Sequence, residues 1–174
     1  RILIMGSSGA GKTYLARALS KHLSLPHLEL DAIRHQADWQ PLPDREFREW
    51  VSAFCSGDAW VVDGNYAVVR DLIIERSTDV VLLDYSKRIY DPVDNALAMA
   101  CFVEKATMNG NRERFHYLLS LNPDLNVVLW SWINFERRRA EFDTIAAPGL
   151  RVHRFTEVIT TESLIEMIES NDSK

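Results

Sequence analysis

The sequence predicts a three-layer α/β fold in which a parallel sheet is covered by helices on both faces. Strand-like runs alternate with helical segments, and residues 79–84 form the continuous apolar run typical of a buried parallel strand. In addition, a glycine-rich turn joins the first strand to the first helix. The expected strands, the third with its exit turn, span residues 2–5, 25–31, 59–66, 79–84 and 150–155. The expected helices span residues 14–23, 45–54, 68–75, 92–107, 125–142 and 163–170. For the second of these helices, Asp44 is the expected cap, and Phe47, Trp50, Val51 and Phe54 are expected on one apolar face.

Length and composition indicate one globular domain over residues 1–174. The chain has 174 residues, of which 47% are hydrophobic and 26% charged, so it can bury a sizeable core. No repeat, low-complexity segment or linker interrupts it. No apolar run approaches the roughly 18 residues of a membrane span. The two cysteines, Cys55 and Cys101, are too few for a disulfide framework and fit a reducing cytoplasm.

The motif G-x-x-x-x-G-K-[ST] at residues 6–13 is the strongest functional signal in the chain. It lies between an apolar strand and a helix, which is the setting that a phosphate-binding loop requires. Lys12 is expected to reach the β- and γ-phosphates, and the Thr13 hydroxyl to bind Mg²⁺. The residues expected to surround the phosphates are Ser8, Gly9, Ala10, Gly11, Lys12 and Thr13.

Three aspartates follow predicted strands, and the carboxyl ends of parallel strands meet at one edge of a sheet. Asp63 and Asp84 compete for the role of second carboxylate near Mg²⁺. We favour Asp63, because it opens a turn toward the site, whereas Asp84 is typical of a strand-end cap. Asp31 is the candidate that orients an acceptor hydroxyl or accepts its proton, with a helix cap as the alternative.

The segment after Asp31 combines polar and aromatic side chains and predicts an acceptor-binding wall. We expect Arg34, Trp39 and Tyr66 to take part with Asp31. His35 alone is weak evidence, because a lone histidine is more often a surface residue than a catalytic one.

Phosphoryl transfer also needs positive charge around the transferred group. The available clusters are Arg112 with Arg114, and Arg137 with Arg138 and Arg139. Consecutive residues of a helix point in different directions, so at most two of the last three face the phosphates. We predict Arg138 as the catalytic arginine.

These residues resemble the adenylate kinase-like group of small P-loop kinases, and within it the proteins labelled DNA topology modulation proteins. The resemblance lies in the phosphate loop, in Asp31, in Trp-Val-Val-Asp-Gly-Asn-Tyr at 60–66 and in Val-Val-Leu-Leu-Asp at 80–84. It covers residues 1–90 and thins out afterwards.

The resemblance implies a P-loop NTPase fold with strand order 2-3-1-4-5. It also implies an acceptor-binding insertion at about 32–57 and a helical lid at about 88–147 that supplies arginines. The chain departs from the family at 92–97, where Pro-Val-Asp-Asn-Ala-Leu stands in place of arginines.

We therefore expect an ATP-dependent phosphotransferase that uses Mg²⁺ and a small nucleotide-like or hydroxylic acceptor. The chain has no Asn/Thr-Lys-x-Asp pattern of the GTPases, which favours ATP. A nucleotide-binding ATPase or switch that acts through a partner is the alternative. The net charge of −5 argues against a third possibility, a nucleic-acid binder.

Overall fold

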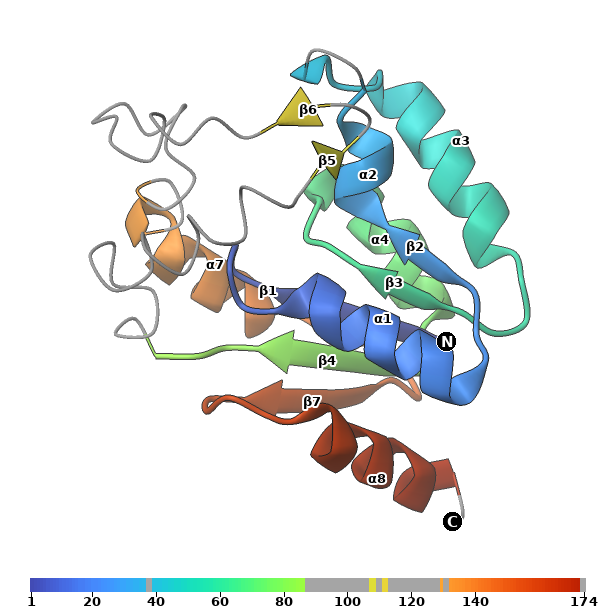
Figure 1. The fold of residues 1–174 in the computed structure, drawn as a ribbon, viewed down its shortest axis with the longest axis vertical. Helices are drawn as coiled ribbons and strands as arrows, with labels where there is room; N and C mark the ends of the chain where they lie inside the picture. Colours follow the sequence, from blue (N-terminus) through green and yellow to red (C-terminus); the bar gives the residue numbers. More distant parts are fainter. Residues whose placement is uncertain (37–38, 87–106, 109–110, 113–128, 130–131, 173–174) are drawn as a thin grey trace.

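The computed structural model describes residues 1–36, 39–86, 107–108, 111–112, 129 and 132–172 (Figure 1). Its main sheet has five parallel strands in the order β2-β3-β1-β4-β7, which confirms the predicted order. The strands are β1 (Ile2–Gly6), β2 (His27–Glu29), β3 (Val61–Asp63), β4 (Asp79–Leu83) and β7 (Arg151–Phe155). Because all five are parallel, their carboxyl ends lie at the same edge of the sheet (Figure 1).

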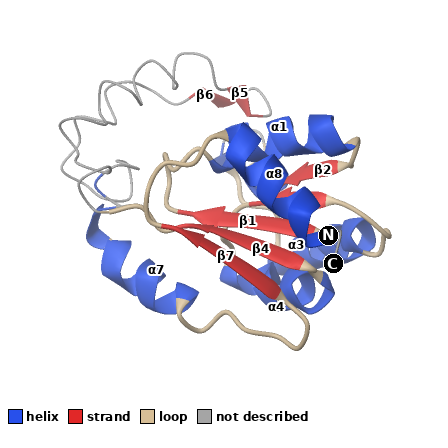
Figure 2. Ribbon diagram, turned by 90° about the horizontal axis from the view of Figure 1, so that it is seen from below, coloured by secondary structure: helices blue, strands red, loops and turns tan. Residues whose placement is uncertain are grey.

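Helices cover both faces of this sheet, as predicted (Figure 2). One face carries α1 (Lys12–Leu23) and α8 (Thr161–Asp172), and the other carries α3 (Asp44–Cys55) and α4 (Ala67–Arg76). The alternation of side chains along β1 produces the two cores. Ile2 and Ile4 belong to the cluster with α1 and α8, whereas Leu3 and Met5 belong to the cluster with α3 and α4.

The second strand is shorter than predicted, and Asp31 lies in a helix rather than at a strand end. Strand β2 ends at Glu29 and helix α2 (Leu30–Arg34) follows at once. The helical turn places Leu30, which is 1% exposed, directly against Gly64. A Cβ on Gly64 would lie 2.8 Å from the Leu30 Cβ, and the φ of Gly64 is +135°, so the close approach depends on glycine.

Two expectations for α3 were wrong. Asp44 is the first helical residue and does not cap the helix; instead it accepts a hydrogen bond from Arg34 at 2.7 Å. Trp50 was expected on the apolar face but is 63% exposed. The buried face follows the spacing of Phe47, Val51 and Cys55, which leaves Trp50 on its outer side.

The predicted lid segment is described only in part. Helix α7 (Phe135–Phe142) packs on the core, since Phe135 joins the α1/α8 cluster and Phe142 joins the α3/α4 cluster. Strands β5 (Thr107–Met108) and β6 (Asn111–Arg112) form an antiparallel pair, which ends the predicted 92–107 helix before Thr107. The rest of that helix, residues 125–128 of the next one and Arg114 lie outside the described residues.

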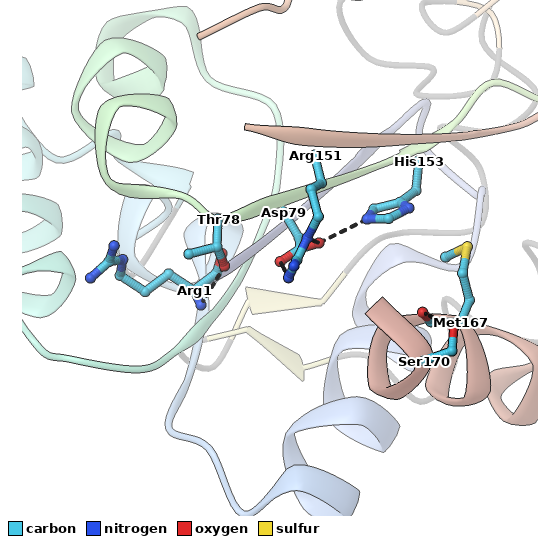
Figure 3. Close-up of polar contacts among 7 residues, drawn as sticks. All are labelled: Arg1, Thr78, Asp79, Arg151, His153, Met167 and Ser170. Atoms are coloured by element: carbon cyan, nitrogen blue, oxygen red, sulfur yellow. Dashed lines mark hydrogen bonds and ion pairs between the residues drawn. The ribbon is translucent and has the colours of Figure 1, made fainter. Parts of the chain in front are cut away.

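The amino edge of the sheet is closed by a compact ionic cluster (Figure 3). The buried carboxylate of Asp79 accepts hydrogen bonds from Arg151 at 2.7 and 2.8 Å and from His153 at 2.8 Å. Burial alone would raise the pKa of Asp79, but the bonds from His153, Arg151 and Thr78 outweigh it and hold that pKa well below its usual range.

No helix in the described part of the chain is both long and apolar enough to cross a membrane. Cys55 is buried, as expected, and burial raises the pKa of its thiol to about 11. Cys101 lies outside the described residues.

Candidate active site

The phosphate-binding loop connects β1 to α1 at the carboxyl edge of the sheet. Gly11 is the N-cap of α1 with a φ of 84°, a left-handed conformation that favours glycine. The N–H of Ala10 donates to the Ser7 carbonyl at 3.1 Å, which closes the loop on itself. The first N–H groups of α1 have no intrahelical partner, as at any helix N-terminus, so they can bind an anion.

Lys12 lies at the centre of the charges around this loop. Its ammonium donates to the Ser7 carbonyl at 3.0 Å. Burial lowers the pKa of Lys12, an effect that the negative charge of Asp31 opposes and the positive charge of Arg138 reinforces. Asp63 and Glu29 oppose it further. The predicted site residues Asp31, Asp63 and Arg138 therefore lie within electrostatic reach of Lys12.

Thr13 and Asp63 form the candidate magnesium site. The Thr13 hydroxyl donates to Asp63 Oδ2 at 2.7 Å, so two hard oxygen ligands from separate elements lie side by side. Within the described residues no group of three or more His, Cys, Asp or Glu side chains could hold a metal. The pair therefore suits Mg²⁺, which takes few protein ligands and completes its shell with phosphate and water oxygens.

Sequence reasoning did not find the histidine behind this pair. His27 at the start of β2 contacts Asp63 Oδ1 through Nε2 at 2.7 Å. Asp63 is 1% exposed, so the histidine and the threonine together fix its carboxylate. The available signal was the strand period, because His27 and Glu29 share one face of β2 and Glu29 pairs in register with Asp63.

Asp84, the competitor of Asp63, lies in a different environment. It accepts hydrogen bonds from Arg154 of β7 and forms an ion pair with Arg139 of α7 at 3.3 Å. Arg154 also binds Asp143 at the end of α7. Two guanidinium groups thus bind Asp84, which connects β4, β7 and α7.

The candidate acceptor site surrounds Asp31. The Tyr66 hydroxyl donates to Asp31 Oδ1 and lies 3.1 Å from His35 Nε2. Burial, followed by the charge of Asp31, raises the pKa of Tyr66 well above its usual value. The phenol therefore keeps its proton at neutral pH and remains a donor.

Aromatic rings form the wall beside this carboxylate. Trp39 makes an edge contact with His35 at a centroid distance of 5.5 Å, and Phe47 contacts Tyr66 in the same way at 5.4 Å. Arg34 lies over Phe47 at 5.3 Å and donates to the Leu42 carbonyl at 2.7 Å. The structure thus brings the four predicted acceptor residues together, with Arg34 bound into the wall.

The three consecutive arginines of α7 point in three directions, as helix geometry requires. Arg137 lies 3.9 Å from Glu141 on the surface, and Arg139 pairs with Asp84. Arg138 is 8% exposed, and its charge acts on both Lys12 and Tyr66. It is therefore the one of the three that lies beside the phosphate loop.

Ion pairs hold α7 against the core. Arg70 of α4 donates to Glu141 at 2.8 Å and to Asn65 at 2.9 Å, which joins α7 to the turn after Asp63. Its Nε atom is buried without a hydrogen-bond partner among the described residues. Sequence reasoning missed this anchor, because nothing local in the sequence indicates that residues 70 and 141 meet.

This arrangement defines the class of protein: an α/β protein with the fold of the P-loop kinases. Shikimate kinase from Acinetobacter baumannii, in complex with shikimate, matches with a TM-score of 0.57 at 19% identity over 99% of this chain and 94% of that one. Shikimate kinase from Aquifex aeolicus matches with a TM-score of 0.54 at 14% identity, over 99% of this chain and 96% of that one.

A transferase of another kind matches equally well. The tRNA isopentenylpyrophosphate transferase from Bacillus halodurans gives a TM-score of 0.57 at 8% identity over 99% of this chain and 95% of that one. Neither a protein-family model nor a curated protein matches the sequence. The likeness shows the fold, and the reaction has to be argued from the site.

Proposed function

We propose that the protein transfers the γ-phosphate of ATP to the hydroxyl of a small molecule, with Mg²⁺. The observation that carries this proposal is the convergence of a phosphate loop, two aspartates with different partners and a buried arginine. Lys12, Asp31, Asp63 and Arg138 come from four separate elements, and the charges of the other three act on Lys12. Phosphoryl transfer needs this combination of positioning and charge.

On the donor side, the loop N–H groups and the N-terminus of α1 bind the phosphate oxygens. Lys12 exchanges its contact with the Ser7 carbonyl for the β- and γ-phosphates. Arg138 stabilises negative charge on the transferred group. Thr13 and Asp63 would hold Mg²⁺, which would neutralise part of the phosphate charge.

On the acceptor side, Asp31 accepts a hydrogen bond from the attacking hydroxyl. A bond forms between the acceptor oxygen and the γ-phosphorus, and the bond from that phosphorus to the β–γ bridging oxygen breaks. The hydroxyl proton passes to Asp31 and then to water, and ADP leaves. Trp39 and Tyr66, whose ring packs against the buried Phe47, give the acceptor an aromatic surface to pack on.

The test is ADP formation from Mg–ATP against a panel of nucleosides, nucleoside monophosphates and polyols, with shikimate included. Lys12→Ala is run beside Lys21→Ala, which removes an exposed lysine from the same helix. We expect one acceptor class to raise ADP formation well above the rate without acceptor, with Lys12→Ala inactive and Lys21→Ala unaffected. ATP binding without acceleration by any acceptor would contradict the proposal and favour a nucleotide-dependent switch.

A further inference from the structure

The hydroxyl of Tyr66 connects two side chains that the reaction scheme above does not link. It donates to Asp31 Oδ1, and it lies 3.1 Å from His35 Nε2. Asp31 is the second residue of α2, His35 is the C-cap of that helix, and Tyr66 is the N-cap of α4. The contact therefore ties the two ends of α2 to the turn that follows Asp63.

The protons available to these three side chains fix the donor and acceptor of each hydrogen bond in the series. A phenol has one proton, and here it goes to the carboxylate, which in its ionised form can only accept. The Tyr66 oxygen must then accept from His35, so His35 carries a proton on Nε2. The order is His35 Nε2–H to Tyr66, and Tyr66 O–H to Asp31 Oδ1. Within the described residues, Oδ2 of Asp31 accepts no hydrogen bond.

Packing holds the rings of Tyr66 and His35 in place. The Tyr66 ring contacts Phe47, which is 0% exposed, and the His35 ring contacts Trp39. Trp39 has a φ of 57°, an uncommon conformation for a residue other than glycine, which the chain adopts where the ring meets His35. The bridge between His35 and Pro41 closes this loop.

We propose that His35 and Tyr66 are positioning residues that hold the Asp31 carboxylate so that only Oδ2 receives the acceptor hydroxyl. This inference rests on the proposed function, because it assigns the two residues to the same transfer step. It also changes the role of Tyr66, from contact with the acceptor to orientation of Asp31. Misplacing a reacting group by about 1 Å can cost about a hundredfold in rate.

The first experiment compares Tyr66→Phe, His35→Gln and His35→Asn in ADP formation, with water and with the panel compounds as acceptors. The amide nitrogen of glutamine can take the place of Nε2, whereas that of asparagine lies nearer to Nδ1. We expect kcat to fall about tenfold to a hundredfold in Tyr66→Phe and about tenfold in His35→Asn, with the KM for ATP unchanged. His35→Gln should stay within about threefold of the native kcat. Equal losses in both His35 variants, or an unchanged kcat in Tyr66→Phe, would overturn the proposal.

The second experiment needs no turnover. Long-range ¹H–¹⁵N spectra report which ring nitrogen of a neutral histidine carries the proton, and His35→Gln identifies the signal. We expect the Nε2–H form in the native protein and a smaller share of that form in Tyr66→Phe. The Nδ1–H form in the native protein would overturn the proposed hydrogen bond from His35 to Tyr66 even if the enzyme transfers phosphate. The Nε2–H form with no ATP turnover for any acceptor would instead contradict the proposed function, and the positioning role with it.

Discussion

The two edges of the sheet both hold buried aspartates, but their partners differ. At the amino edge, Asp79 is matched by the Arg151 guanidinium and by His153 (Figure 3). At the carboxyl edge, Asp63 contacts a hydroxyl and a histidine, and Asp31 contacts a phenol. Among the described residues, Asp63 and Asp31 thus have no guanidinium partner.

We infer that this difference separates structural carboxylates from those of the proposed active site. A carboxylate that arginines saturate has little capacity left for a metal ion or a substrate, and removing it leaves the arginines without their counter-charge. A carboxylate without a guanidinium partner keeps its charge available. Asp84 shows that the position of an aspartate in the sheet does not by itself determine its partners. It lies at the carboxyl edge and yet, like Asp79, is bound by guanidinium groups, those of Arg154 and Arg139.

The largest expected effect is on activity, when the positive charge at the centre of the carboxyl edge is removed. Lys12→Ala should lower phosphoryl transfer by about 10²- to 10³-fold, because the lysine supplies charge to the transferred group. Thermal unfolding should change little, since the one hydrogen bond that the Lys12 side chain makes to the described residues is with the Ser7 carbonyl. Steady-state kinetics and a melting curve on the same preparation measure both. Loss of stability with retained kcat would reverse the assignment.

At the amino edge, Asp79→Asn should lower the free energy of unfolding by about 2–3 kcal/mol at pH 7 without affecting the KM for ATP. The folded-state pKa of Asp79 is depressed, so its contribution is complete above the ordinary aspartate pKa of about 4. As the pH falls below about 4 toward the depressed pKa, that contribution is lost. Denaturant unfolding from pH 7 to pH 3 should therefore show the difference between the proteins shrinking, and a constant difference would contradict this.

A matched pair of substitutions compares the two carboxyl-edge aspartates. Asp63→Asn should raise the Mg²⁺ concentration for half-maximal activity by about tenfold to a hundredfold. Asp84→Asn should leave that concentration unchanged and cost about 1–3 kcal/mol of stability, because its arginine partners are partly solvated. Magnesium titrations and denaturant curves on both variants give the answer. If Asp84→Asn shifts the magnesium curve as much as Asp63→Asn, partner type does not distinguish the two roles.

The smallest expected effect is on stability, when an ion pair that lies at neither edge of the sheet is broken. Arg45 pairs with Glu49 on the outer side of α3, and both side chains are exposed. Solvent screens such a pair, so Arg45→Ala should shift the thermal midpoint by about 1–2 °C or less. A larger shift of the melting curve would show that the exposure of an ion pair does not predict its contribution to the stability of this protein.

The sequence was sufficient for the features that depend on local pattern. The alternation of strands and helices predicted the α/β class, and the motif at residues 6–13 predicted the turn between β1 and α1, where the candidate phosphate site lies. The strand order came from the resemblance and is confirmed. The preference for Asp63 over Asp84 agrees with their surroundings, although their roles remain predictions.

What the sequence did not give depends on contacts between distant residues. Helix α2 places Leu30 against Gly64, a contact that no sequence window around residue 30 reveals. The contact of His27 with Asp63 depends on strand register, and the partners of Asp84 come from elements far along the chain. Trp50 was misplaced because apolar spacing on a short helix fits two neighbouring faces.

The most direct test of the account follows the γ-phosphate itself. Phosphorus-31 NMR of Mg–ATP with the native protein and the panel compounds shows where that group goes, and Arg138→Met serves as the comparison. We predict a new phosphomonoester signal with one acceptor class, formed together with ADP, and a much slower rise in Arg138→Met. Inorganic phosphate as the only product, or an unchanged ATP spectrum with every compound, would contradict the claim that the carboxyl edge is a phosphoryl-transfer site.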